Sequence, residues 1–257
     1  MREPLTLVTT DGERLDAVHV LPSGHAPSPD VAVVVAHGFT GSWRRPALAR
    51  IAAHLAARFG VLAFDFRGHG RSSGLSTVGD REFLDVEAAV SAARALGYGQ
   101  VVTLGFSMGG AAVVRHAGLH GGVDAVVTVS APARWHYRGT RRMRQVHWVI
   151  ERRMGRVVAR RWLGTRVTAT GWNPPPAPPT DLAPRIAPTP LLVVHGDRDP
   201  FLPVEHAQAL HDAAGDPREL WVVPNFGHAE AAMGPVLLER LATRVPDLVA
   251  SRTGTGG

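Results

Sequence analysis

Ser107 lies at the centre of the pentapeptide Gly105-Phe106-Ser107-Met108-Gly109, a G-x-S-x-G pattern. The apolar run 101–106 predicts a buried strand, and residues 108–120 have the pattern of a helix. A serine on a sharp strand-to-helix turn needs small neighbours two positions away on either side, and the turn points its hydroxyl out of the sheet. The helix N-terminus behind it stabilises negative charge. This context predicts a nucleophilic serine rather than an ordinary glycine-rich turn.

A nucleophilic serine needs a base and an acid that orients the base, because its hydroxyl reacts poorly at neutral pH. We expect His228 to be the base among 13 histidines, because it follows the last predicted strand. The acid is expected in the segment 195–200, also at a strand end. We favour Asp199, which lies further from the strand and can turn toward His228. Asp197 suits a turn former that binds nearby backbone.

Hydrolysis of an acyl group also requires two N–H donors for the oxyanion that forms. The backbone N–H of Met108, directly after the serine, is one expected donor. The second is the N–H of Phe39, in the loop His37-Gly38-Phe39-Thr40-Gly41-Ser42 that follows an early strand. His37 is a tempting catalytic candidate, but we expect it to hold this loop by hydrogen bonds.

The composition excludes several other chemistries. The chain has no cysteine, so it has no disulfide, thiolate metal site or cysteine nucleophile. All 28 basic residues are arginine, which excludes a phosphate-loop lysine, a Schiff-base lysine and a kinase-type lysine. The glycine-rich segment 65–74 does not have the register of a dinucleotide loop. His37, His69 and His195 lack a known zinc-ligand spacing, and we expect neither a metal nor an organic cofactor.

Alternating strands and helices must position these residues. Asp11-Gly12 between two alternating runs predicts a β-hairpin. The apolar runs that predict strands are 31–38, 61–66, 101–106, 125–130, 191–196 and 219–224, and the helical patterns are 46–59, 80–96, 108–120, 203–214 and 230–249. The predicted fold class is therefore α/β, with a mostly parallel central sheet and helices on both faces.

The alternation stops between residues 133 and 189, which predicts a helical cap inserted into a core of residues 1–132 and 190–250. This cap segment holds 12 arginines, two acidic residues and four of the six tryptophans. One or two helices are expected at 141–163, with an apolar side that includes Met154 and Val157. The proline-rich segment 173–190 is expected to be irregular, and residues 251–257 a disordered tail. We expect three tryptophans to line the substrate pocket: Trp43, Trp135 and Trp148.

Five sequence blocks carry a resemblance to a known family. They are DGERL, HGFTGS, DFRGHGRSSG, GFSMGG, and HGDRDPFLP followed by NFGH. Over roughly residues 5–250 the sequence resembles the α/β-hydrolase family, and within it the monoacylglycerol lipase-like, serine aminopeptidase-like and feruloyl esterase-like branch. The resemblance implies a triad of Ser107, Asp199 and His228, with Phe39 and Met108 as oxyanion donors.

The expected activity is hydrolysis of carboxylic esters through an acyl-enzyme. The same residues could instead hydrolyse amides or thioesters, transfer acyl groups or form peracids. A non-catalytic binding module is a further alternative, which the presence of all three residues at strand ends disfavours. A small acyl compound is the expected partner and nucleic acid is not. The arginines and tryptophans of the cap also suit transient contact with an anionic or amphiphilic surface. Without an apolar signal segment or membrane span, a cytoplasmic location is expected.

Overall fold

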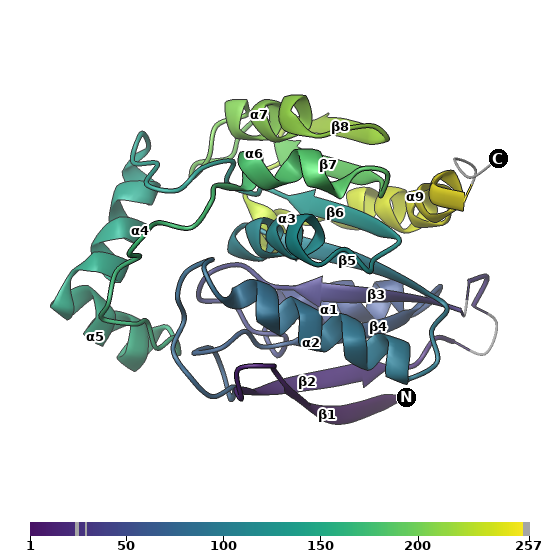
Figure 1. Ribbon diagram of the computed structural model, residues 1–257, viewed down its shortest axis with the longest axis horizontal. Coiled ribbons are helices and arrows are strands. Elements are labelled where there is room, and N and C mark those ends of the chain that lie inside the picture. Colours follow the sequence, from purple (N-terminus) through teal and green to yellow (C-terminus); the bar gives the residue numbers. More distant parts are fainter. Residues whose placement is uncertain (24–25, 29, 254–257) are drawn as a thin grey trace.

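An eight-stranded sheet forms the centre of the protein (Figure 1). The computed structural model describes residues 1–23, 26–28 and 30–253. The strand order is β1-β2-β4-β3-β5-β6-β7-β8. The strands β3 to β8 are parallel to one another, whereas β1 pairs antiparallel with β2 and β2 pairs antiparallel with β4. The strands are β1 (Arg2–Val8), β2 (Arg14–Val20), β3 (Val31–Ala36), β4 (Gly60–Phe64), β5 (Gln100–Phe106), β6 (Ala125–Val129), β7 (Leu191–Gly196) and β8 (Arg218–Val223).

The predicted strands are buried because helices cover both faces of the sheet. Every residue of β3 is buried, as the continuous apolar run indicated. One face packs against α1 (Pro46–Leu55), α8 (Ala229–Ala232) and α9 (Pro235–Thr253). The other packs against α2 (Glu82–Ala95), α3 (Met108–Leu119) and α7 (Glu205–Ala213). The expected α/β fold class is confirmed.

The first two strands form the hairpin that Asp11-Gly12 predicts. Gly12 has a positive φ of 90°, a conformation that glycine adopts without the steric cost of a side chain. Thr9 holds the turn by donating its hydroxyl to Asp11 and accepting the N–H of Glu13. This hairpin extends the sheet at the edge next to β4.

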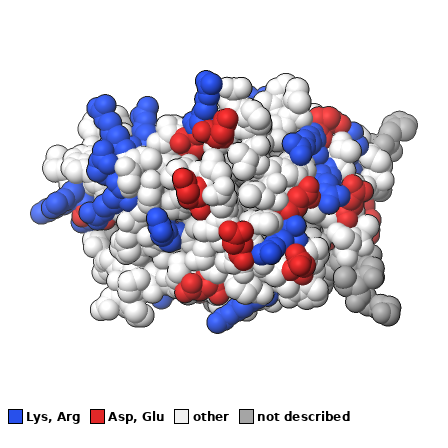
Figure 2. Space-filling model, turned by 90° about the horizontal axis from the view of Figure 1, so that it is seen from above, with Lys and Arg blue, Asp and Glu red and all other residues white. Residues whose placement is uncertain are grey.

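Two helices inserted between β6 and β7 stand at one end of the sheet, on the left of Figure 1. They are α4 (Arg141–Glu151) and α5 (Arg153–Trp162), and they pack chiefly against each other. Thr140 caps the start of α4 by accepting the N–H of Met143. Arginine side chains gather over this end of the molecule in Figure 2.

The apolar side predicted for these helices is only partly buried. Met154 is 65% exposed, Val157 48% and Trp162 72%. The inward contacts of α5 come instead from the small buried residues Gly155 and Ala159. A periodicity of apolar residues does not tell which side of a two-helix insertion meets the core.

Three further segments differ from the sequence-based expectations. The proline-rich segment contains α6 (Pro179–Leu182) and the short 3-10 helix η1 (Ala183–Ile186), which pack against α3. Proline is compatible with a first helical turn, and burial of the apolar residues stabilises both turns. The helix predicted at 230–249 is divided into α8 and α9, and α9 continues to Thr253, beyond the expected start of the tail. Residues 254–257 lie outside the described part of the chain. None of the described helices is long and apolar enough to cross a membrane.

Candidate active site

Ser107 occupies a strained turn between β5 and α3. Its backbone has φ 50° and ψ −114°, which is rare for a residue with a side chain. A Cβ on Gly105 would lie 2.3 Å from the carbonyl oxygen of Gly109, and a Cβ on Gly109 would lie 2.4 Å from that of Ala36. The turn therefore requires glycine at both positions, which is the physical basis of the G-x-S-x-G pattern.

The structure brings the predicted nucleophile, base and acid together from three separate strand ends. His228 Nε2 lies 3.0 Å from Ser107 Oγ, and His228 Nδ1 lies 2.6 Å from Asp199 Oδ2. The second oxygen of Asp199 accepts the N–H groups of Phe201 and Leu202 at 2.8 and 3.1 Å. Because the carboxylate takes the Nδ1–H of His228, the lone pair on Nε2 faces the serine hydroxyl. This arrangement can move a proton from Ser107 to His228.

Asp199 is ionised in this environment. Burial by itself raises the pKa of its carboxyl, but the hydrogen bond and charge of His228 and the two backbone N–H donors outweigh it, so the pKa is lowered on balance. An ionised Asp199 stabilises the imidazolium that forms on His228 during proton transfer. Phe201 covers this pair, with its ring centroid 4.4 Å from that of His228.

Asp197, the alternative acid, makes a different contact. Its Oδ1 accepts the N–H of Asn225 at 2.7 Å. It thereby connects the loop after β7 to the loop that carries His228, as a turn former would. The carboxylate that contacts the His228 ring is that of Asp199.

The loop that carries Phe39 is held by two buried histidines. His37 Nε2 accepts the N–H of Phe66 at 3.0 Å, so its Nδ1 carries the proton and donates to the oxygen of Gly38 at 2.7 Å. His69 Nε2 accepts the N–H of Thr40 at 3.3 Å. Burial lowers the pKa of His37 to about 4 and also lowers that of His69, so both rings are neutral at pH 7. The structural role expected for His37 is confirmed.

The two proposed oxyanion donors both border the cavity above Ser107. Phe39 and Met108 line it, and within the described residues neither backbone N–H donates a hydrogen bond to the protein. Met108 is the first residue of α3, where the N–H groups have no partner inside the helix. Two N–H groups free to bind one oxygen are what an oxyanion site needs.

A cavity of about 640 Å³ opens over Ser107 and His228 and reaches up to the cap. Trp135 lines it, but the expectation for Trp43 and Trp148 is wrong, because neither is among the described lining residues. The indole N–H of Trp43 donates to Asp16 on β2, and Trp148 is 47% exposed on α4. The cavity wall also contains Trp172, a cap residue that the sequence analysis did not assign to the pocket.

Glu230 is a pocket residue that the sequence analysis missed. It lies two positions after His228, lines the cavity, and accepts the N–H of Gly38 at 3.2 Å. A carboxylate two positions after a predicted base carries no distinct sequence signal, since exposed acidic residues are common at helix starts. Only the approach of α8 to the loop after β3, across 192 residues of sequence, places it beside Ser107.

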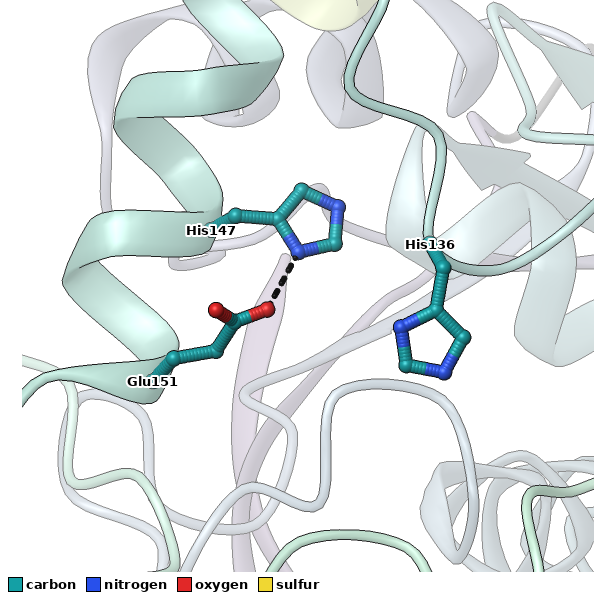
Figure 3. A group of neighbouring side chains, drawn as sticks. All are labelled: His136, His147 and Glu151. Carbon is teal, nitrogen blue, oxygen red and sulfur yellow. Dashed lines mark hydrogen bonds and ion pairs between the residues drawn. The ribbon is translucent and has the colours of Figure 1, made fainter.

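One group of described side chains could hold a metal ion. His136, His147 and Glu151 each offer one ligand atom, and these atoms lie within 4.8 Å of one another (Figure 3). In the structure, His147 Nδ1 lies 2.8 Å from the carboxylate of Glu151, which also forms an ion pair with Arg138. Arg138 and His147 both contact Oε1 of this carboxylate. The group belongs to the cap and not to the strand-end loops that carry Ser107 and His228.

Comparisons with known proteins agree with this architecture. The uncharacterised protein YfhR of Escherichia coli K12 is 24% identical over 236 residues, which is 89% of this chain and 74% of that protein. The Pyrococcus furiosus esterase Pf2001 superposes with a TM-score of 0.72 at 22% identity, covering 97% of this chain and 92% of the other. The esterase domain of a Rhodothermus marinus protein gives 0.66 at 25% identity, covering 98% and 99%.

A comparison of the sequence with protein families gives a match over most of its length. Residues 33–243 match the alpha/beta hydrolase family. This range includes the turn at Ser107 and the strand ends that carry Asp199 and His228. The resemblance inferred from the five sequence blocks is confirmed at the level of the family, and the chain belongs to the alpha/beta hydrolase family.

Proposed function

We propose that this protein is a serine hydrolase that cleaves carboxylic esters through an acyl-enzyme. The observation that carries the proposal is the unbroken chain of contacts from Ser107 Oγ through His228 to Asp199, at 3.0 and 2.6 Å. A binding module needs no carboxylate hydrogen-bonded to the far nitrogen of a histidine that contacts a serine. The similarity to two esterases supports the choice of an ester as substrate.

The proposed reaction has two stages. His228 Nε2 takes the proton of Ser107 as the serine oxygen attacks the acyl carbon, and the N–H groups of Phe39 and Met108 bind the oxyanion. His228 then gives the proton to the departing alcohol. Water repeats the sequence on the acyl-enzyme, releases the acid and restores the serine. Asp199 keeps the imidazole oriented throughout and stabilises its charged form.

The cavity over Ser107 favours an apolar acyl group or alcohol. Its walls combine the aromatic rings of Trp135 and Phe201 with aliphatic side chains of α4, including Val146 and Ile150. Apolar walls with a few polar groups near the reacting atoms are typical of small-molecule sites. A volume of about 640 Å³ admits a substrate of the size of a medium-chain ester.

Hydrolysis of p-nitrophenyl esters from acetate to palmitate, together with fluorophosphonate labelling, tests the proposal. We expect wild type to label and turn over, and Ser107→Ala to lose both. The acyl chain length with the highest kcat/KM then indicates the length of acyl chain that the pocket holds. A wild type that neither labels nor hydrolyses any ester would overturn the ester hydrolase proposal. Labelling without ester turnover would favour amide hydrolysis or acyl transfer on the same residues.

We also propose that the exposed side of α5 contacts anionic, amphiphilic surfaces. This side, here called the α5 face, comprises Met154, Val157, Arg161 and Trp162. Met154, Val157 and Trp162 are apolar and exposed, and Arg161 is an exposed cation. Tryptophan and arginine together suit a lipid headgroup region, where the indole packs at the boundary and the guanidinium binds phosphate or carboxylate.

A further inference from the structure

The carboxylate of Glu230 lies close to the reacting serine. Its Oε1 accepts the N–H of Gly38 at 3.2 Å. A Cβ built on Gly38 would lie 3.3 Å from Glu230 Oε2 and 3.3 Å from Ser107 Cβ. Glu230 is half-buried and forms part of the cavity wall, as Ser107 does. The carboxylate therefore lies across Gly38 from the nucleophile, within reach of a bound substrate.

Within the described part of the chain, this carboxylate has no cationic partner. Among the described residues, no arginine or histidine nitrogen lies within 4.0 Å of it, and Gly38 provides its one protein hydrogen bond. Two other acids, by contrast, pair with a cation: Asp199 with His228, and Asp85 with Arg67 at 2.7 Å. A charge placed in a largely apolar cavity without a partner costs free energy, so its presence calls for a reason beyond packing.

The two arginines of the cavity wall do not supply the missing charge. Arg142 lies over the ring of Phe201, with its guanidinium carbon 6.0 Å from the ring centroid. Arg134 lies over the ring of Tyr137 at 5.8 Å. Both are exposed side chains of the cap, whereas Glu230 belongs to α8, which follows β8. The wall therefore carries positive charge on the cap and negative charge beside the serine.

A role as a simple tether for Gly38 does not account for the charge. An amide oxygen accepts the same N–H and carries no net charge. For a neutral substrate, a carboxylate beside the oxyanion site is unfavourable, because negative charge develops on the substrate oxygen in the transition state. A cation bound next to the carboxylate neutralises the negative charge and so removes that repulsion. The carboxylate in turn stabilises the positive charge of the cation.

We propose that Glu230 forms a subsite for a cationic group of the substrate, an ammonium or quaternary ammonium close to the scissile bond. This inference rests on the proposed ester hydrolase function. The cation belongs either to the alcohol, as in an amino-alcohol ester, or to the acyl group, as in an amino-acid ester. In both cases the shared chemistry is an ion pair between the substrate nitrogen and the Glu230 carboxylate.

Paired ligands of equal shape test the subsite. Choline and 3,3-dimethylbutanol, which represent the alcohol part of a substrate, have the same shape, but only choline carries a positive charge. Glycinamide and propanamide are a similar pair for the acyl part. We expect at least one cation to inhibit p-nitrophenyl ester hydrolysis by wild type about fivefold more strongly than its neutral partner, as for a partly exposed ion pair. In Glu230→Gln, which keeps an acceptor for Gly38 N–H, this ratio falls to about one. The pair that shows the effect identifies the end that carries the charge.

Two further measurements keep the inference separate from the proposed function. Calorimetric titration of choline and glycinamide into Ser107→Ala measures cation binding without turnover, so it remains decisive if wild type hydrolyses no ester. Glu239→Gln, which removes a carboxylate that pairs with Arg58 on the surface, is the matched control and should leave the ratio unchanged. Equal ratios in wild type and Glu230→Gln would overturn the subsite and leave Glu230 as a tether. A wild type without labelling or turnover would overturn the ester hydrolase proposal instead.

Discussion

The strand-end loops and the cap place their charged residues in opposite environments. In the loops, His37, His69 and the carboxylate of Asp199 are buried, and hydrogen bonds fix each of them. In the cap, most arginines are exposed and the apolar side chains of the α5 face are open to solvent. Glu151 is the one acid of α4 and α5, and it pairs with Arg138 and His147.

This difference separates two requirements of an enzyme. Proton transfer depends on distances near 3 Å, so the groups that perform it have to be fixed by packing and by hydrogen bonds. Contact with substrates or surfaces of variable shape does not need fixed geometry, and flexible arginines with exposed apolar groups suit it. We therefore expect substitutions in the loops to have large effects and substitutions on the cap to have small ones.

The largest expected effect is that of Asp199→Asn. An asparagine can donate to His228 Nδ1 and so favour the tautomer with the proton on Nε2, which cannot accept the proton of Ser107. We expect kcat/KM for p-nitrophenyl esters to fall about 10⁴-fold. Asp197→Asn is the matched control, because its amide oxygen still accepts the N–H of Asn225 and activity should change less than about threefold. Equal losses in the two variants would contradict the assignment of Asp199 as the acid.

A second pair of variants compares the tolerance of the two regions to one added methyl group. In Gly105→Ala the new Cβ would lie 2.3 Å from the carbonyl oxygen of Gly109, so the turn at Ser107 must shift. We expect a loss of about 3 kcal/mol in the free energy of unfolding, measured by urea denaturation. In Gly171→Ala, within the cap segment, nothing lies within 4 Å of the new Cβ, and stability should change by less than about 0.5 kcal/mol. Similar losses would show that the loops and the cap are packed alike.

The same difference in packing explains which parts the sequence predicted well. Strands such as β3 are covered on both faces, so their continuous apolar runs identify them without knowledge of the fold. In the turn at Ser107 only glycine fits at the positions of Gly105 and Gly109, so the local sequence reflects the geometry of the turn. The chain order of acid and base then follows from the ends of successive strands.

The pocket could not be predicted in the same way. Whether Trp148 faces the cavity or the solvent depends on how α4 lies over the core, and nothing in its own segment specifies this. Trp43 finds a hydrogen-bond acceptor in Asp16, a contact between elements distant in sequence. Glu230 and Gly38 meet across 192 residues. These features arise from tertiary approach, which the local pattern does not encode.

Acidification should destabilise the strand-end loops through the buried His37. In the folded state the pKa of His37 is lowered from 6.5 to about 4 by burial, so the unfolded chain binds the proton more strongly and the folded protein loses stability as pH falls from 6.5 toward 4. Between pH 7 and pH 5 this one group should cost about 2 kcal/mol of the free energy of unfolding. Arginines do not titrate in this range, so the cap contributes nothing through them.

Urea denaturation of wild type and His37→Gln at both pH values measures this contribution. The variant should lose about 2 kcal/mol less than wild type on acidification, whatever its own stability at pH 7. If His37→Gln does not fold, His69→Gln gives the same test, because burial lowers the pKa of that ring too. Identical pH dependence of wild type and a folded variant would show that these histidines are not held neutral.

The smallest expected effect belongs to the α5 face, at Arg161. A cation near an anionic lipid surface contributes about 1 kcal/mol to binding, and Arg161 is exposed on the same side as the apolar Val157 and Trp162. Arg161→Gln should therefore weaken binding to vesicles that contain phosphatidylglycerol about fivefold in a sedimentation assay, without altering hydrolysis of soluble short-chain esters. Arg185→Gln, at an exposed arginine of η1 that packs with the core, is the matched control.

The vesicle composition decides between charge and apolar contact as the origin of any binding. With neutral phosphatidylcholine vesicles, Arg161→Gln should behave as wild type, while Trp162→Ala should weaken binding to both vesicle types, because the indole is 72% exposed and its insertion does not depend on lipid charge. If wild type binds neither vesicle, the α5 face has no role at a lipid surface. Equal weakening by Arg161→Gln and Arg185→Gln would mean that overall charge attracts the membrane. The difference between the fixed strand-end loops and the adaptable cap would then rest on packing alone.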